Sequence, residues 1–233
     1  MDFEAWESVY ESILADFGFD RAADERARDV LAGFAEPFDL ARLDVTDETV
    51  VIAGAGPSLE SDLDPLSDEM PSDGAVFAAS TAADRLAEAD VEVDCMVTDL
   101  DKNPETVRSL TERGTPVAVH AHGDNEPLVR DVVPTLDTRN VLATTQAAPV
   151  GPVRNVGGFT DGDRAAFLAD CCGADRLQFV GWDFDGNSVG SMKRQKLAWA
   201  ERLLYWLERR RDERFGVLDG RRGGIDTDAL PIE

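Results

Sequence analysis

The chain has 233 residues, with 47 acidic and 23 basic side chains and a formal net charge of −24. At 43% hydrophobic residues it can still build a core, so the acidity does not indicate a disordered chain. Only three of the basic residues are lysine, and we interpret this composition as adaptation to high salt, as in halophilic archaea, where charge repulsion is screened. The charge disfavours nucleic acid as a partner, because nucleic acid requires a basic surface.

The length fits one medium α/β domain with small additions. No apolar run is long enough to span a membrane and the first residues lack the regions of a signal peptide, so we expect a cytoplasmic protein without a membrane partner. We expect an N-terminal helical segment over residues 1–45, an α/β domain over residues 46–215 and a C-terminal tail over residues 216–233. The sequence leaves the oligomeric state open and is compatible with a homo-oligomer.

The predicted elements alternate between strands and helices along the chain. Apolar side chains at three- and four-residue steps predict two helices between residues 3 and 34. Short apolar runs bounded by turn residues predict strands at residues 49–53, 75–79, 94–98, 116–119, 141–145 and 177–180. Helices are predicted at residues 81–89, 104–112, 164–172 and 191–211. This order predicts an α/β fold with a mostly parallel, doubly wound (Rossmann-like) sheet, an N-terminal helical extension and a long C-terminal helix.

A glycine-rich turn, Gly54-Ala55-Gly56-Pro57-Ser58, follows the first strand. Such a turn between a strand and a helix can present backbone N–H groups to a phosphate. It matches the dinucleotide-binding fingerprint poorly, because the third glycine would fall at Leu59. The alternative is a tight strand-to-helix turn without a ligand.

The third predicted strand runs into Asp99-Leu100-Asp101-Lys102. Residues two apart in an extended strand point to the same side, so Asp99 and Asp101 can face one point. Two converging carboxylates are suitable ligands for Mg²⁺. Taken alone, the stretch fits equally well a solvated turn before a helix.

The fourth predicted strand is followed by His120-Ala121-His122-Gly123-Asp124. Asp124 would add a third carboxylate to the metal site. The spacing of the two histidines and the aspartate could instead bind zinc. Because the chain has no other histidine and no thiolate motif, we favour histidines that line the site as hydrogen-bond donors.

Two features of the later part of the chain have local structural explanations. Gly157-Gly158 indicates close approach of the backbone to a neighbour. Thr160 and Asp163 match a helix capping box, as Thr81 and Asp84 do earlier in the chain.

The three lysines are informative because the chain otherwise uses arginine. They are Lys102, directly after the aspartate pair, and Lys193 and Lys196, at the start of the last predicted helix. A compact point charge of this kind suits phosphate oxygens. We therefore expect the lysines to contact a phosphorylated ligand.

A parallel sheet would bring four strand ends to one edge. These are the glycine turn, the aspartate pair, the histidine-containing turn and the last strand end with Asp183 and Asp185. Open α/β sheets bind their ligands at this carboxyl edge. Carboxylates for Mg²⁺, lysines for phosphates and glycine turns with N–H donors are the parts of a phosphoryl- or diphosphoryl-transfer site.

The ordered set of motifs resembles the archaeal 6-hydroxymethyl-7,8-dihydropterin pyrophosphokinase family, and the resemblance covers nearly the whole chain. It rests on Gly54-x-Gly56-Pro57-Ser58-Leu59, Thr98-Asp99-Leu100-Asp101, His120-Ala121-His122-Gly123-Asp124-Asn125, Gly157-Gly158-Phe159-Thr160-Asp161-Gly162-Asp163-Arg164, Gly181-Trp182-Asp183-Phe184-Asp185-Gly186 and Lys193-x-x-Lys196-Leu197. More distantly the chain is similar to thiamine pyrophosphokinases, in which an Asp-x-Asp and a later aspartate hold Mg²⁺. Asp99, Asp101 and Asp124 match those positions, but the thiamine enzymes usually have serine or threonine where this chain has Lys102.

The resemblance implies Mg²⁺-dependent transfer of diphosphate from ATP, as co-substrate, to the pterin hydroxymethyl group. AMP leaves, and the product serves the biosynthesis of a folate or methanopterin type cofactor. The implied metal ligands are Asp99, Asp101 and Asp124, and the implied catalytic residues are Asp99, Asp101, Lys193 and Lys196. The residues expected to bind ATP or the pterin are Gly54, Gly56, Ser58, Lys102, His120, His122, Gly157, Gly158, Asp183 and Asp185, with Trp182 a candidate for stacking.

Three alternatives stay open. Thiamine could replace the pterin as acceptor. An Asp-x-Asp also holds the metal of nucleotide-sugar-dependent transferases, and a nucleotide sensor without catalysis would need many of the same groups.

Overall fold

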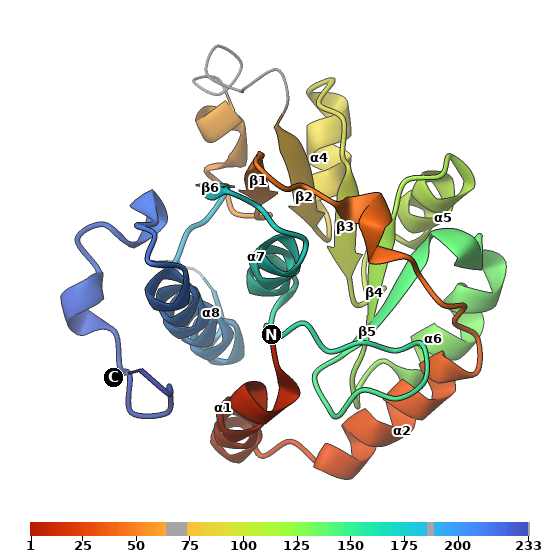
Figure 1. Ribbon diagram of the computed structural model, residues 1–233, viewed down its shortest axis with the longest axis horizontal. Helices are drawn as coiled ribbons and strands as arrows, with labels where there is room; N and C mark the ends of the chain where they lie inside the picture. Colours follow the sequence, from red (N-terminus) through yellow and green to blue (C-terminus); the bar gives the residue numbers. More distant parts are fainter. Residues whose placement is uncertain (64–73, 186–188, 233) are drawn as a thin grey trace.

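The computed structural model describes residues 1–63, 74–185 and 189–232. Gly186, the last residue of one motif named above, lies outside the described residues. Within them, one sheet of six parallel strands has the order β5-β4-β3-β2-β1-β6 (Figure 1). The strands are β1 (Thr49–Ala53), β2 (Ala75–Ala79), β3 (Cys95–Thr98), β4 (Val117–Ala121), β5 (Val141–Thr145) and β6 (Arg176–Val180).

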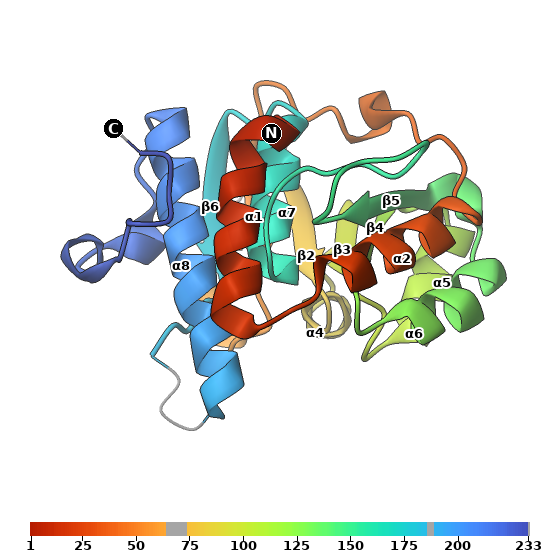
Figure 2. The ribbon, with the colours of Figure 1, turned by 90° about the horizontal axis from the view of Figure 1, so that it is seen from below.

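Helices cover both faces of the sheet. They are α1 (Phe3–Phe17), α2 (Arg21–Ala32), α4 (Ala82–Glu88), α5 (Pro104–Glu112), α6 (Glu126–Val132), α7 (Asp161–Cys171) and α8 (Ser191–Arg211). Short 3₁₀ turns occur at Leu40–Leu43, Val133–Thr135, Thr138–Asn140, Gly216–Leu218 and Arg222–Gly224. On one face α7 crosses β1, β2 and β3 with α1 and α8 beside it, while α2, α4, α5 and α6 cover the other (Figures 1 and 2). This confirms the predicted doubly wound fold with a long C-terminal helix.

The N-terminal helix joins the core through its aromatic stripe. Trp6 is fully buried and stacks on Trp206 of α8 with ring centroids 6.4 Å apart, and it meets Phe167 of α7 edge-on. Burial of such large rings supplies much of the packing energy between helices. The α1–α2 turn is thereby held close to the carboxyl ends of the strands.

Several element boundaries differ from the sequence prediction. Strand β4 continues two residues further, because His120 and Ala121 pair with Thr144 and Thr145 of β5. His120 therefore lies inside the strand rather than after it. Helix α7 begins at Asp161, three residues before the predicted start, and helix α6 was not predicted.

The two predicted capping boxes have different outcomes. The carboxylate of Asp163 accepts a hydrogen bond from the backbone N–H of Thr160 at 2.9 Å, which confirms the box at the start of α7. The box at Thr81 is wrong, because this residue has helical dihedral angles and its side chain makes no capping hydrogen bond.

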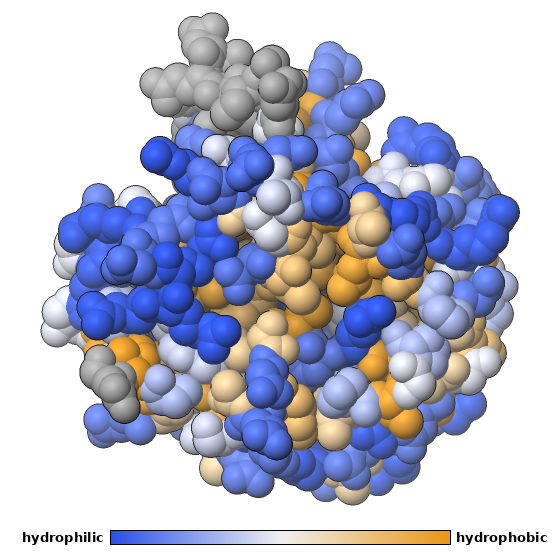
Figure 3. Space-filling model, in the orientation of Figure 1, coloured by the Kyte–Doolittle hydropathy of each residue, from blue (hydrophilic) through white to orange (hydrophobic). Residues whose placement is uncertain are grey.

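Hydrophilic side chains dominate the face of the molecule in Figure 3, and apolar side chains gather near its centre. None of the helices in the described ranges combines the length and apolar character needed to cross a bilayer.

Candidate active site

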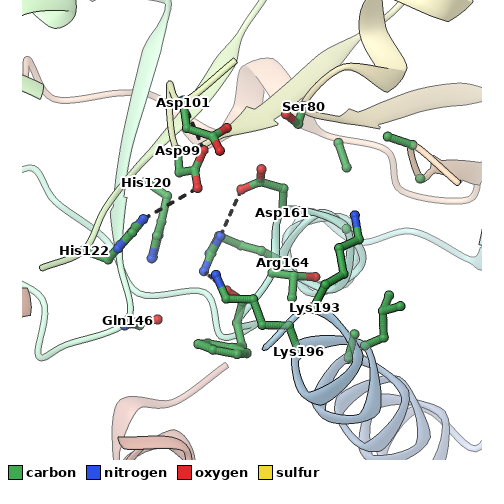
Figure 4. A pocket seen from close by; sticks show the side chains of 18 of the residues that line it. Ser80, Asp99, Asp101, His120, His122, Gln146, Asp161, Arg164, Lys193 and Lys196 are labelled. Carbon is green, nitrogen blue, oxygen red and sulfur yellow. Dashed lines mark hydrogen bonds and ion pairs between the residues drawn. The ribbon is translucent and has the colours of Figure 1, made fainter. Parts of the chain in front are cut away.

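A cleft of about 730 Å³ lies at the carboxyl edge of the sheet. The segments that follow all six strands contribute to its lining, as do the starts of α7 and α8 and the α1–α2 turn. Representative lining residues, one from the end of each strand in the order β1 to β6, are Gly54, Ser80, Asp99, His122, Gln146 and Gly181. The predicted convergence of strand ends at one site is therefore confirmed (Figure 4).

The aspartate pair after β3 faces the cleft with a backbone conformation that the sequence did not predict. Strand β3 ends at Thr98, and Leu100 adopts a left-handed conformation with φ of 70°. The extended geometry expected for Asp99 to Asp101 is therefore wrong. Leu100 is 1% exposed, and the backbone N–H of Asp101 donates to the Asp99 carboxylate at 3.2 Å. A non-glycine residue with this backbone stores strain of about 1–3 kcal/mol, which is typical of functional turns.

The pKa values of the two carboxyl groups are shifted in opposite directions. Burial alone would raise the pKa of Asp99, but hydrogen bonding from His122 and Asp101 outweighs it and holds that pKa below its usual value. Burial and the adjacent Asp99 raise the pKa of Asp101. Two close carboxylates of this kind tend to share a proton, and a divalent cation can replace that proton.

Asp161, at the first position of α7, is a third carboxylate on this side of the cleft (Figure 4). Burial and the charge of Asp99 raise its pKa to about 7. Asp161 was not predicted as a site residue, although it lies in one of the motifs that carry the family resemblance. Its signal was an acidic residue in the first helical turn, which also has a purely structural explanation.

Asp124 also lines the cleft but is exposed. In the ranges that the structure describes, no group of three or more His, Cys, Asp or Glu side chains is placed to hold a metal ion. The three ligands predicted for Mg²⁺ are thus not gathered into one ready-made set. The donor chemistry still fits a hard cation, because Asp99 and Asp101 are adjacent carboxylates in the cleft and each shifts the pKa of the other.

The two histidines present different atoms to their surroundings. The backbone N–H of Asp124 approaches Nδ1 of His122 at 3.4 Å, and the Nε2 atom of His122 lies 3.6 Å from the Asp99 carboxylate. We therefore assign the proton of His122 to Nε2, where it faces Asp99. This placement fits the donor role expected for that residue.

His120 is 1% exposed, and its Nδ1 lies 3.2 Å from the hydroxyl of Thr144. That hydroxyl already donates its single proton to the carbonyl of Val119 at 3.1 Å, so it can only accept from Nδ1–H. Burial and the charge of Arg164 hold the pKa of His120 well below its usual value, so the ring is neutral. Its Nε2 is then a hydrogen-bond acceptor, which differs from the donor role expected for both histidines.

All three lysines of the chain line the cleft. Lys193 and Lys196 project from the first turns of α8 toward the carboxylates, and Lys102 has its Nζ 3.9 Å from Asp101 (Figure 4). The first turn of α8 contains no acidic residue, which is unusual in so acidic a chain. Lys193 and Lys196 therefore face the aspartate pair across the cleft, and Lys102 lies beside it.

Arg164 of α7 lies between these two groups and was missed as a site residue. It is 2% exposed, and its guanidinium donates to the carbonyl of Phe159 at 2.8 Å and approaches Asp161 at 3.4 Å. Its Nε has no hydrogen-bond partner among the described residues. A buried, permanently charged guanidinium with spare donor capacity suits an anionic ligand.

The backbone N–H groups of the glycine turn after β1 donate hydrogen bonds to the end of β6 and the turn that follows it. The N–H of Gly56 donates to the carbonyl of Gly181 at 2.8 Å, and that of Ser58 donates to the carboxylate of Asp183 at 3.0 Å. The N–H of Gly54 donates to the carbonyl of Val180. A side chain at Gly56 would collide with Asp183 and Gly181. These three N–H groups are thus engaged within the protein, as in the alternative of a tight turn.

Among the remaining predicted residues, Gly157, Gly158 and Asp185 are not part of the cleft lining. Gly157 and Gly158 have left-handed backbones, and a side chain at Gly158 would collide with Arg164 at the start of α7. The predicted close approach is confirmed, but its partner is a helix. The side chain of Asp185 is 81% exposed and pairs with Arg221 at 2.6 Å. Trp182 lines the cleft, and its indole N–H donates to the carbonyl of Ile52.

A parallel α/β sheet with a charged cleft at its carboxyl edge defines this chain as a protein with a site for small, polar ligands. A family model described as 6-hydroxymethylpterin diphosphokinase MptE-like matches residues 29–188. The chain is 41% identical to the 6-hydroxymethyl-7,8-dihydropterin pyrophosphokinase of Methanothermobacter thermautotrophicus, over 92% of this chain and 98% of that protein. Proteins of the same name are 37% identical in Pyrococcus furiosus and 31% identical in Methanocaldococcus jannaschii. Each match covers 89% of this chain, and 95% and 96% of those proteins respectively.

The chain belongs to the MptE-like family of 6-hydroxymethylpterin diphosphokinases. This confirms the resemblance drawn from the ordered motifs.

Proposed function

We propose that the protein transfers the diphosphoryl group of ATP, in the presence of Mg²⁺, to the hydroxymethyl oxygen of 6-hydroxymethyl-7,8-dihydropterin. The products are the pterin diphosphate and AMP. The observation that carries the proposal is the cleft itself, in a chain whose curated relatives bear the pyrophosphokinase name. One side of this cleft carries carboxylates, and the other carries every lysine of the chain except Lys102, which follows the carboxylates.

The positive side chains of the cleft can compensate the charge of a bound polyphosphate. In a protein with a net charge of −24, a bound polyphosphate needs positive side chains close to it. Lys193, Lys196 and Arg164 supply positive charge within the cleft, where water is partly excluded and each contact is stronger than on the surface. We assign these three residues to the phosphate oxygens of the transferred group.

The carboxylate side would hold the metal. Asp99 and Asp101 are the ligands we assign, with Asp124 as a further ligand from the adjacent turn. When bound there, Mg²⁺ would neutralise phosphate charge and orient the chain of phosphates for in-line transfer. His122 donates toward Asp99 and so fixes the orientation of that carboxylate.

The test is the reaction itself. The protein is incubated with ATP and Mg²⁺ and with hydroxymethyldihydropterin, thiamine or no acceptor, in molar salt as the composition suggests. We expect AMP and a pterin diphosphate with the pterin alone. Thiamine diphosphate as product would identify the thiamine alternative. AMP release without any acceptor would indicate simple hydrolysis and would contradict the proposal.

The product of this reaction carries a diphosphate leaving group on an exocyclic carbon. We propose that it is consumed by a condensation that displaces the diphosphate, as in the assembly of folate or methanopterin type cofactors.

A further inference from the structure

The corner of the cleft between β4, β5 and the N-terminal helices contains a group of buried polar side chains that the transfer step does not use. Asp24, His120 and Gln146 all line the cleft and are 3%, 1% and 4% exposed. Polar groups this deeply buried are normally fully hydrogen-bonded. Their remaining hydrogen-bonding capacity therefore indicates what a ligand at this corner must supply.

Asp24 fixes the orientation of the Gln146 amide. Its carboxylate accepts three hydrogen bonds of 2.7 Å, from the backbone N–H of Gly123, the hydroxyl of Tyr10 and the amide nitrogen of Gln146. Burial and the hydrogen bond to Asp24 raise the pKa of Tyr10, so its hydroxyl stays a donor. Because a carboxylate accepts and does not donate, the amide nitrogen of Gln146 must face Asp24, and the amide oxygen is turned away.

His120 presents a second acceptor beside this amide. Its Nδ1–H is committed to Thr144, and among the described residues its Nε2 has no hydrogen-bond partner. Gln146 is its neighbour across the β4–β5 pair, since His120 pairs with Thr144 and Gln146 follows Thr144 by two residues into the same cleft. In Figure 4 the two side chains occupy the same side of the cleft. Two acceptors that face one space require a group with two donors.

We propose that Nε2 of His120 and the amide oxygen of Gln146 bind an exocyclic amino group on the acceptor heterocycle, held in register by the Asp24 carboxylate. A primary amino group has two N–H donors and satisfies both acceptors at once. The proposal rests on the proposed function, in which the acceptor is a pterin with such a group at C2. Asp24 is a positioning residue, because it acts through Gln146.

The shape of this corner also suits a flat ring. Phe19 and Phe159 line the cleft here, and Phe17 lies between them with its ring centroid 5.1 Å from each. Half-buried aromatic faces bind planar heterocycles by stacking. Phe19 and Asp24 precede residue 29, where the family model match begins. Recognition of the acceptor therefore depends partly on a segment outside the matched region.

The test compares two planar ligands that differ in the group at C2, the proposed contact. Pterin carries an amino group at C2 and lumazine an oxo group, and both are followed by fluorescence titration of the full chain in molar salt. We expect the wild type to bind pterin at least about tenfold more tightly, because lumazine leaves buried acceptors unpaired. In Asp24→Asn, the new side-chain amide can donate to Gln146, so the Gln146 amide turns over and presents its N–H to the ligand. The preference for pterin should fall to near one.

Asp170→Asn is the matched control, since Asp170 lies on α7, pairs with Arg211 and does not line the cleft. It should keep the wild-type preference.

If Asp24→Asn unfolds, the ratio of the pterin and lumazine affinities is measured in Gln146→Met and His120→Gln instead. Gln146→Met should lose the preference, and His120→Gln should retain part of it through its own amide oxygen. Equal binding of the two ligands by the wild type, or an unchanged preference in Asp24→Asn and Gln146→Met, would overturn the proposal. If the wild type still makes pterin diphosphate in that case, only this inference fails; a preference without turnover would instead count against the proposed function.

Discussion

The turn after β1 and the turn after β3 both carried the sequence pattern of a ligand site, and the structure uses them differently. The backbone N–H groups of the first turn are hydrogen-bonded to the end of β6 and the turn after it. Those of Gly54 and Gly56 donate to the carbonyls of Val180 and Gly181, and that of Ser58 donates to the carboxylate of Asp183. The Asp99 and Asp101 carboxylates of the second turn interact with each other, with His122 3.6 Å from Asp99 and Lys102 3.9 Å from Asp101.

Polar groups that are satisfied within the protein stabilise it, whereas charges held close together without full compensation are available to a ligand and cost stability. Substitutions in the first turn should therefore lower stability, and those in the second should lower activity.

The largest effect is expected for Asp101→Asn. Loss of one carboxylate from the metal ligand pair should lower kcat/KM for diphosphoryl transfer by about 100-fold or more. The unfolding temperature should stay the same or rise, because the repulsion with Asp99 is removed. AMP release and thermal unfolding measure the two quantities. Turnover at the wild-type rate would show that the metal site is elsewhere.

Gly56→Ala tests the other side of the comparison. The added methyl group would collide with the carboxylate of Asp183 and the carbonyl of Gly181, and overpacking of this kind lowers the free energy of unfolding by about 1–3 kcal/mol. Denaturant titration gives the value. Gly216→Ala is the matched control, since nothing lies within 4 Å of its added methyl group. Equal stability of the two variants would mean that the β1 turn is not tightly packed.

The fold and the location of the site could be predicted from the sequence because both follow from patterns of neighbouring residues. Strands β1, β2 and β5 and helices α5 and α8 have the predicted bounds, since apolar runs and flanking turn residues define them locally. Parallel pairing then places every strand end at one edge.

The individual contacts could not be predicted in the same way. The pairing of Ser58 with Asp183 joins residues 125 positions apart, and no local pattern specifies it. Asp24 lies in an amphipathic helix, where an aspartate is ordinarily solvated. The sequence therefore did not predict that this carboxylate is buried and hydrogen-bonded to Gln146. Leu100 gave the pattern of an extended strand, but burial of its side chain was achieved with a left-handed backbone.

The last prediction concerns the pH dependence of the unfolding free energy. Asp161 has a pKa of about 7 in the folded protein because of burial and the charge of Asp99, against an ordinary value near 4. Between these values the folded state binds one more proton than the unfolded state, so stability falls as pH rises from about 4 to about 7, by up to ~1.4 kcal/mol per pH unit. Asp161→Asn removes this contribution and should flatten the curve of unfolding free energy against pH over that window.

Asp170→Asn, on the same helix but outside the cleft, should keep the wild-type slope. Denaturant titrations at several pH values, with a chelator present, give the three curves. Parallel curves for Asp161→Asn and the wild type would show that the carboxylates after β3 do not hold a proton on Asp161, and that this turn is as well compensated as the one after β1.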